Sequence, residues 1–170
     1  MIPYQFSWFF EGEKVGWLKL RIIETRDEAE IYDHCWTGNS SISDQLNVCN
    51  IAEAYPALLL RRIDINQDVR NKNHGTALLK FVEDFALRKR CSFCFCKLEL
   101  NDDMDMELQS FYQRRGWTLI EETTQRIIHI PDPDEAYIMG YITPRKGVFS
   151  DVIGYHAEEL PVPDSEKQLE

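Results

Sequence analysis

The chain reads Arg70-Asn71-Lys72-Asn73-His74-Gly75-Thr76-Ala77-Leu78-Leu79 at the point where a predicted strand, 57–66, meets a predicted helix, 75–90. Apolar residues alternate with polar ones in the first segment and recur at helical spacing in the second. The first turn of a helix has N–H groups without intrahelical partners and carries the positive end of the helix dipole. With Arg70 and Lys72, these groups predict a site for a phosphate or pyrophosphate.

A second interpretation of this segment is a charged turn that is solvated and binds no ligand. The segment is not a Walker A loop, because the spacing GxxxxGK before Ser or Thr is absent. It is not a Rossmann dinucleotide loop either, since Gly75 is its only glycine. The segment alone leaves the anion site and the solvated turn both open.

Length and charge limit the class of protein. The 170 residues suit a single domain. The net charge of −10 lacks the basic footprint of nucleic-acid binding, so we expect no nucleic-acid partner. Acidity often serves solubility alone, and it also favours a cationic substrate such as an amine. No apolar run reaches the roughly 20 residues of a membrane span, and the N-terminus does not resemble a signal peptide, so we expect a cytoplasmic protein without a membrane partner.

Five cysteines occur without a secretion signal, and their odd number favours reduced thiols. The spacing Cys91-x-x-Cys94-x-Cys96 allows a zinc site as an alternative. A structural zinc ion takes four ligands, and no second CxxC or HxxxH partner is present, so we expect no metal. On a buried strand these cysteines act as small apolar residues.

The order of predicted elements indicates an α/β fold with a mixed sheet. Residues 4–24 read as a hairpin about a glycine-containing turn. The segment 25–56 has no clear pattern. The remaining elements are a strand at 92–100, a helix at 104–115 that Gly116 ends in a left-handed conformation, and strands at 117–130 and 136–143.

A second motif lies further along the chain, at Ser110-Phe111-Tyr112-Gln113-Arg114-Arg115-Gly116-Trp117. By itself it is also compatible with Phe111 and Tyr112 packing in a core. Together the two motifs resemble the GNAT N-acyltransferase superfamily. Its acyl-CoA loop follows Q/R-x-x-G-x-G/A, often as RGKGIGTALL, and stands here as RNKNHGTALL; its later motif FYxxxGF stands here as FYQRRGW. The resemblance is strongest from Leu58 to Trp117.

The resemblance implies a mixed, mostly antiparallel, twisted sheet with flanking helices in one domain over 1–150. Within it, 4–24 is the N-terminal hairpin, 25–56 an insertion and 57–143 the acyl-CoA core. Residues 156–170 are expected to form a flexible tail. In the family, a strand and helices precede the hairpin; we expect no counterpart of them here, and the insertion is the candidate substitute for their acceptor wall.

The implied co-substrate is acetyl-CoA or another acyl-CoA, and the implied acceptor is an amine. Loop N–H groups would bind the pyrophosphate, and backbone groups of the preceding strand would pair with the pantetheine like an added strand. Asparagine at the first loop glycine tolerates a positive φ, so the turn is retained. The side chain of His74 is expected to face solvent. The implied cofactor-binding residues are Ile63, Ile65, Arg70, Asn71, Lys72, Asn73, His74, Gly75, Thr76 and Asn101, with Asp105 as the alternative to Asn101.

The implied reaction is direct attack of the amine on the thioester carbonyl. Tyr112 occupies the position of the family's general acid, and a phenol with a pKa of about 10 can donate its proton to the departing thiolate. Asp64 and Glu99 are candidates for the base that deprotonates the ammonium. Strand carboxylates beside lysine and arginine are also often surface partners. A backbone N–H near Ile65 would stabilise the oxyanion.

Two other functions remain open. The first is a non-catalytic module of the same fold that binds acyl-CoA as a sensor. The second is an interaction protein that uses exposed aromatic residues, namely Phe6, Trp8, Phe9 and Trp17. The sequence leaves the acceptor and the oligomeric state open, with a homodimer as one arrangement.

Overall fold

A computed structural model of the chain describes residues 2–25, 28, 55–69, 73–100, 105–121 and 136–163. Most of the predicted insertion 25–56 lies outside these residues, as does the part of the predicted strand 117–130 beyond residue 121. Among the described residues, no helix combines the length and the apolar character needed to cross a membrane.

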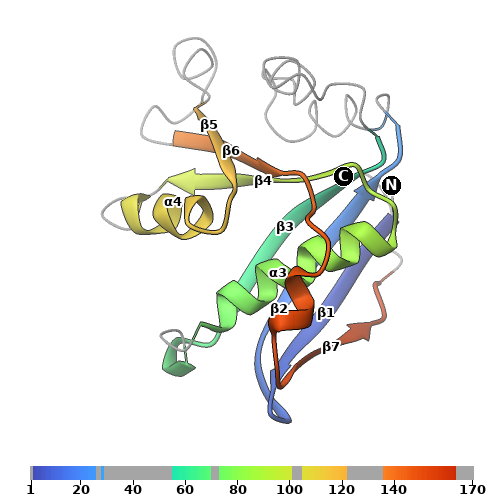
Figure 1. The fold of residues 1–170 in the computed structure, drawn as a ribbon, viewed down its shortest axis with the longest axis vertical. Coiled ribbons are helices and arrows are strands. Elements are labelled where there is room, and N and C mark those ends of the chain that lie inside the picture. Colours follow the sequence, from blue (N-terminus) through green and yellow to red (C-terminus); the bar gives the residue numbers. More distant parts are fainter. Residues whose placement is uncertain are drawn as a thin grey trace.

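Within the described residues, seven strands form one sheet in the order β5-β6-β4-β3-β2-β1-β7 (Figure 1). Among these seven strands, β3 and β4 pair in parallel, and every other neighbouring pair is antiparallel. The predicted mixed, mostly antiparallel sheet is therefore confirmed. The strands are β1 (Ile2–Phe10), β2 (Glu13–Ile23), β3 (Ala57–Ile65), β4 (Phe93–Leu100), β5 (Thr118–Glu121), β6 (Ala136–Ile142) and β7 (Tyr155–Leu160).

Two α-helices and two short 3-10 helices connect these strands within the described residues. The α-helices are α3 (His74–Arg88) and α4 (Asp105–Gln113), and the 3-10 helices are η1 (Gln67–Val69) and η3 (Val148–Asp151). Helix α3 begins one residue before the predicted start and ends two residues before the predicted end. Such differences are ordinary at helix ends, where the last turn frays.

Helix α3 lies across one face of strands β1 to β3 (Figure 1). The ring centroids of Phe6 and Trp8 lie 5.3 Å and 5.5 Å from that of Phe81 on the helix. Phe6 is 6% exposed and Trp8 is fully buried, so neither belongs to an exposed aromatic surface, and the interpretation that used them for partner binding is wrong for these two residues. Burying such side chains contributes about 1.5–3 kcal/mol each to folding.

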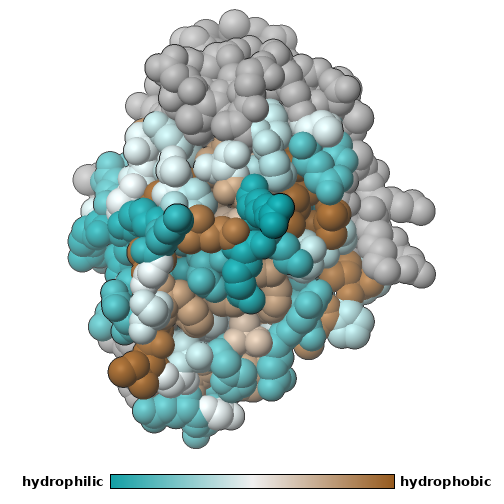
Figure 2. All heavy atoms as spheres, turned by 45° about the vertical axis from the view of Figure 1, so that its right-hand side comes forward, coloured by the Kyte–Doolittle hydropathy of each residue, from teal (hydrophilic) through white to brown (hydrophobic). Residues whose placement is uncertain are grey.

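The centre of the sheet is buried on its other face as well. The side chains there alternate with those that face α3, as expected for residues along a strand. They are among the least exposed in the described chain: Ile23 (0%), Leu59 (0%), Phe93 (0%) and Phe95 (1%). Away from the core, hydrophilic side chains separate the apolar patches on the surface shown in Figure 2.

Strand β7 corrects the prediction of a flexible tail over 156–170. Residues 155–160 pair antiparallel with β1, from Phe10 opposite Tyr155 to Gln5 opposite Leu160. The backbone hydrogen bonds of this strand are formed with β1, and its Tyr155 and Ala157 pack against the core. Residues 164–170 lie outside the described chain.

Candidate functional site

Strands β3 and β4 separate at the centre of the sheet. Their parallel pairing runs from Ala57–Phe93 to Leu60–Cys96 and ends there, although β3 continues to Ile65 and β4 to Leu100. On the other side of β3, the register with β2 shifts so that Arg61 is an extra residue, because Leu20 pairs with Leu60 and Lys19 with Arg62. A bulge of this kind increases local twist. The two strands accordingly diverge toward their C-terminal ends (Figure 1).

The turn into α3 is built around Asn73. Its φ of 62° and ψ of 17° place it in the left-handed region. The expectation that asparagine accepts a positive φ at the position of the first loop glycine is therefore confirmed. The carbonyl oxygen of Asn73 accepts a hydrogen bond from the N–H of Ala77 at 3.2 Å, and its side chain makes no capping hydrogen bond.

The two sequence motifs meet at the start of α3. A Cβ atom on Gly75 would lie 2.9 Å from Cζ of Phe111, so only glycine allows this approach of α3 to α4. The guanidinium of Arg115 donates two hydrogen bonds to Oγ1 of Thr76, the one from Nε at 2.7 Å, and a third to the carbonyl oxygen of Phe111 at 2.7 Å. The same guanidinium carbon lies 4.1 Å from the centroid of the Phe111 ring. The end of α4 therefore fixes the first turn of α3.

His74 differs from its predicted role. Its side chain is 1% exposed, and its ring lies 5.1 Å from that of Phe10 and 5.6 Å from that of Tyr155. The expectation that the side chain faces solvent is wrong, because the residue begins the buried face of α3. The imidazole therefore anchors the helix in the core and does not face solvent.

Tyr112 is buried beside the last paired residue of β4. It is 6% exposed, and its ring meets that of Trp117 edge to face at 5.3 Å. Burial raises the pKa of the Tyr112 hydroxyl well above its ordinary value, and the charge of the neighbouring Cys96 thiolate would raise it further. The phenol is therefore protonated at neutral pH, as a proton donor must be.

The candidate bases lie on β3 and β4. Asp64 is half-buried on β3 opposite Trp17 of β2. Ile63 and Ile65 on either side of it pack against the core that α3 covers, so Asp64 projects from the other face. Tyr112 belongs to that core, and the structure thus places the two on opposite faces of the sheet. The backbone of Glu99 pairs with Tyr137, and its side chain lies outside the described part of the chain.

Four predicted cofactor-binding residues fall outside the described chain, namely Arg70, Asn71, Lys72 and Asn101. Asp105 begins α4, but its side chain is also outside the description. The flanking residues Asn73 and Thr76 are described, so the geometry of the site comes from the first turn of α3 and from the end of α4.

These features correspond to one family. A model of the acetyltransferase (GNAT) family matches residues 2–117. The chain belongs to the GNAT acetyltransferases. No curated protein sequence matches it.

Solved structures share this GNAT fold at low identity. The Drosophila melanogaster polyamine N-acetyltransferase, which forms N-acetylagmatine, is 14% identical with a TM-score of 0.57, over 82% of this chain and 74% of that one. The GNAT-like decarboxylase GphF, in complex with isobutyryl-CoA, is 19% identical with a TM-score of 0.51, over 81% and 76%. Nourseothricin acetyltransferase is 13% identical with a TM-score of 0.50, over 82% and 66%.

The chain spans 66% of nourseothricin acetyltransferase and 56% of another matched structure. At these identities the likeness shows the fold alone. The reaction and acceptor of this GNAT protein are therefore argued below from its own residues.

The buried cysteines of this GNAT domain do not form a metal site with other described residues. Cys91, Cys94 and Cys96 are free thiols in the core, and no group of three potential metal ligands occurs within the described ranges. Burial raises the pKa of Cys91 to about 11 and that of Cys96 to about 12. Thiols that stay protonated are poor nucleophiles and poor metal ligands.

Sequence reasoning missed two contacts that position the site. Arg115 was named only within the second motif, yet its side chain joins the two motifs. Glu83 on α3 is 1% exposed and receives two hydrogen bonds from Arg145, which follows β6. A glutamate among the apolar positions of α3 could have indicated a buried ion pair. The sequence spacing does not identify its partner.

Proposed function

We propose that the protein transfers an acetyl or other acyl group from acyl-CoA to a primary amine. The observation that carries this proposal is the separation of β3 from β4 after Leu60 and Cys96, beside the buried hydroxyl group of Tyr112. Strands that part at the centre of a sheet leave room for an extended ligand between them. That position lies next to the first turn of α3, where a phosphate is favoured.

Acyl-CoA fits both features. Its pyrophosphate would bind N–H groups from residue 71 to Thr76, with Arg70 and Lys72 adding positive charge. Its pantetheine would lie along the backbone of Ile63 and Ile65 as an added strand. The thioester would then reach the point where β3 and β4 part. The isobutyryl-CoA held by the structurally similar GphF supports the same class of ligand.

The acyl transfer would proceed by direct attack. The amine nitrogen forms a bond to the thioester carbon, and the carbonyl oxygen takes the negative charge, which a backbone N–H near Ile65 stabilises. The C–S bond then breaks, and the thiolate takes the phenolic proton of Tyr112. The phenolate of Tyr112 then takes up the proton that the amine nitrogen releases when it forms the amide. The products are an amide and the free thiol of CoA.

The amine must arrive without its extra proton. Asp64 is the candidate base on the face of the sheet opposite Tyr112, and Glu99 is the alternative on β4. If the thioester lies between the two strands, the base on one face can deprotonate the amine, and the acid on the other face can protonate the departing thiolate. The acceptor therefore approaches from the face that bears Asp64, and the thiol leaves on the face covered by α3.

The net charge of −10 favours a cationic amine over a neutral one. The polyamine N-acetyltransferase among the structural matches makes agmatine a reasonable first acceptor. The competing function is acyl-CoA binding without transfer, as in a sensor.

Calorimetric titration with acetyl-CoA and CoA tests the first part of the proposal. We expect micromolar binding that Arg70→Glu abolishes. Arg88→Glu is the matched control, because Arg88 is an exposed arginine at the far end of α3, paired with Asp84 at 3.0 Å. Acetylation of agmatine, spermidine and a lysine peptide, followed by mass spectrometry, tests the second part. Absence of binding overturns the acyltransferase, while binding without any product favours the sensor.

A further inference from the structure

A cavity of about 350 Å³ lies between α3, the end of α4 and the segment after β6. Four of its seven lining side chains are cationic and one is anionic. They are Thr76, Leu79, Lys80 and Glu83 from α3, Arg114 and Arg115 from the turn after α4, and Arg145.

The single acid of the cavity is already neutralised. Nε and Nη2 of Arg145 donate to the two carboxylate oxygens of Glu83 at 2.9 Å and 2.8 Å. Nη2 of Arg145 also donates to the carbonyl oxygen of Arg115 at 2.9 Å. The charges of Glu83 and Arg145 therefore compensate each other. Glu83 does not neutralise the other cations that line the cavity.

The other three cations have no acidic partner in the described part of the chain. Arg114 donates from Nε to the carbonyl oxygen of Ser110 at 3.2 Å, and Arg115 donates to Thr76 and to Phe111, all of which are neutral acceptors. The pKa of the Arg115 guanidinium is lowered by burial and, to a smaller extent, by the charge of Arg114. On a chain whose net charge is −10, this concentration of positive charge is a local exception that attracts an anion.

The cavity continues from the first turn of α3. Thr76 lines it and is the third residue of the helix, and Lys80 follows one turn later on the same side. A ligand whose phosphates bind at the helix N-terminus can therefore place a further anionic group against Lys80. The volume lies at the low end of the range of about 300–1,000 Å³ for ligand pockets, so it suits part of a nucleotide rather than a whole coenzyme.

We propose that this cavity binds the 3′-phosphate on the ribose of coenzyme A, through Lys80, Arg114 and Arg115. The inference rests on the proposed function and names a second anion subsite for the same co-substrate. A phosphomonoester carries a charge of about −1.5 to −2 at neutral pH, and it meets three cations here. Charge-assisted hydrogen bonds to a phosphate are among the strongest that side chains form.

Titration of the full chain with CoA and with dephospho-CoA, which lacks only the 3′-phosphate, tests this subsite. We expect dephospho-CoA to bind at least tenfold more weakly than CoA. Lys80→Gln and Arg114→Gln should each weaken the binding of CoA several-fold and leave that of dephospho-CoA unchanged, which is the coupling that a direct contact produces. Arg115 is left intact because it also holds Thr76.

Lys89→Gln is the matched control, because Lys89 caps the opposite end of α3. It should not change the affinity for either ligand. Equal affinity of the wild-type protein for CoA and dephospho-CoA would overturn the subsite and leave the proposed function standing. Absence of binding by both ligands would overturn the proposed function itself. A tenfold preference that survives in the Lys80→Gln, Arg114→Gln double variant would place the 3′-phosphate elsewhere and overturn the subsite.

Discussion

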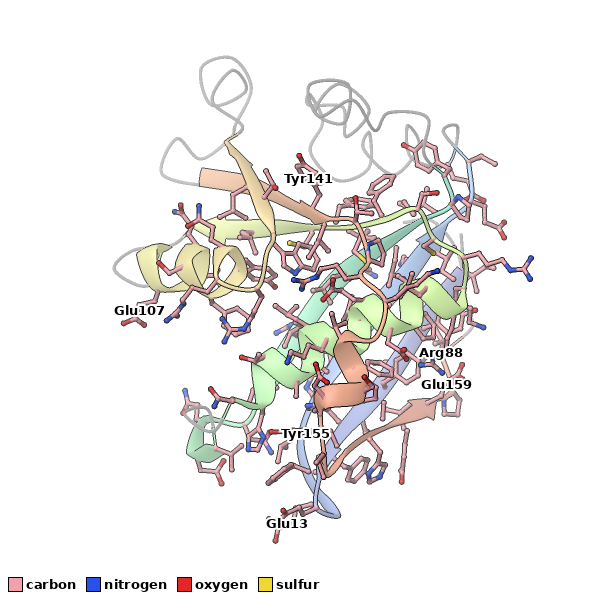
Figure 3. The ribbon with its side chains drawn as sticks, in the orientation of Figure 1. Glu13, Arg88, Glu107, Tyr141, Tyr155 and Glu159 are labelled. Carbon is pink, nitrogen blue, oxygen red and sulfur yellow. The ribbon has the colours of Figure 1, made fainter. Side chains whose placement is uncertain are left out.

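The Nδ1 atom of His74 lies 2.7 Å from the hydroxyl oxygen of Tyr155. One residue begins α3 and the other begins β7, so the contact joins the predicted phosphate loop to the C-terminal strand. The indole Nε1 of Trp8 donates to the carbonyl oxygen of His74 at 3.3 Å, and its ring stacks on that of Tyr155 at 5.2 Å. Figure 3 shows Tyr155 on the side of the molecule where α3 begins, with Arg88 at the other end of the helix. Strands β1 and β7 therefore fix the start of α3, together with the end of α4 through Arg115 and Thr76.

Tyr155→Phe should lower the free energy of unfolding by about 1–2 kcal/mol, because it retains the aromatic ring but removes the hydroxyl group that contacts the buried imidazole of His74. We also expect weaker binding of acetyl-CoA, since the first turn of α3 loses one of its supports. Urea denaturation and calorimetry measure the two effects. Tyr4→Phe is the control, because Tyr4 packs on Phe85 at the far end of α3 through its ring. Equal stability of Tyr155→Phe and the wild type would contradict the role of this contact.

Asn73→Gly should preserve the stability of the protein, whereas Asn73→Ala should reduce it by about 1 kcal/mol, because alanine pays the steric cost of the left-handed conformation. Asn73 makes no side-chain capping bond, so neither variant loses one. Thermal denaturation of the two variants provides the comparison. A more stable Asn73→Ala variant would mean that φ at this position is not positive in solution.

Tyr112→Phe should reduce kcat by about 10²–10⁴-fold, the usual contribution of general acid catalysis, without changing the affinity for acetyl-CoA. Because the pKa of Tyr112 is raised, its ionisation should cause no loss of activity below about pH 10. A pH–rate profile of the wild type and a single-turnover comparison of the variant check both points. Wild-type kcat in the variant would reduce Tyr112 to a packing residue.

The buried thiols should make the fold sensitive to alkali. The pKa of Cys96 is raised to about 12 in the folded state, mainly by burial, and an unfolded thiol ionises near about 8.5. The protonated thiol of Cys96 therefore makes its full contribution to the free energy of unfolding below the unfolded pKa, and this contribution is lost as the pH rises toward the folded pKa. At one pH unit above the unfolded pKa, the loss is about 1.4 kcal/mol. Urea denaturation at pH 7 and pH 9.5 should show a smaller decrease for Cys96→Ala than for the wild type. An identical decrease would exclude this thiol as the cause.

The sequence predicted those features of the site that depend on neighbouring residues in the chain. The strand before Asn73 and the helix after it have clear periodicity, and the tolerance of asparagine for a positive φ is a property of that residue alone. The contact of Arg115 with Thr76 depends on the angle between α3 and α4, which no local pattern encodes. The anchoring of His74 likewise depends on a strand from the other end of the chain.

Strand β7 was missed for a physical reason. Its exposed residues include Glu158 and Glu159, so it lacks the apolar alternation by which strands are identified. An edge strand that pairs on one side needs no such alternation, and charge on it prevents pairing with other chains. The same composition is typical of a polar tail, so the sequence of β7 indicated a tail and not a strand.

The pairing of β7 with β1 has a consequence for biosynthesis. A ribosome releases β1 first and β7 last, although the two are neighbours in the sheet. Until residue 160 has emerged, β1 is an open edge with unpaired backbone groups, and His74 has not met Tyr155. Between the synthesis of β1 and that of β7, the nascent chain therefore has an open strand edge and an incompletely supported start of α3, and in this interval it is most exposed to strand exchange with its neighbours.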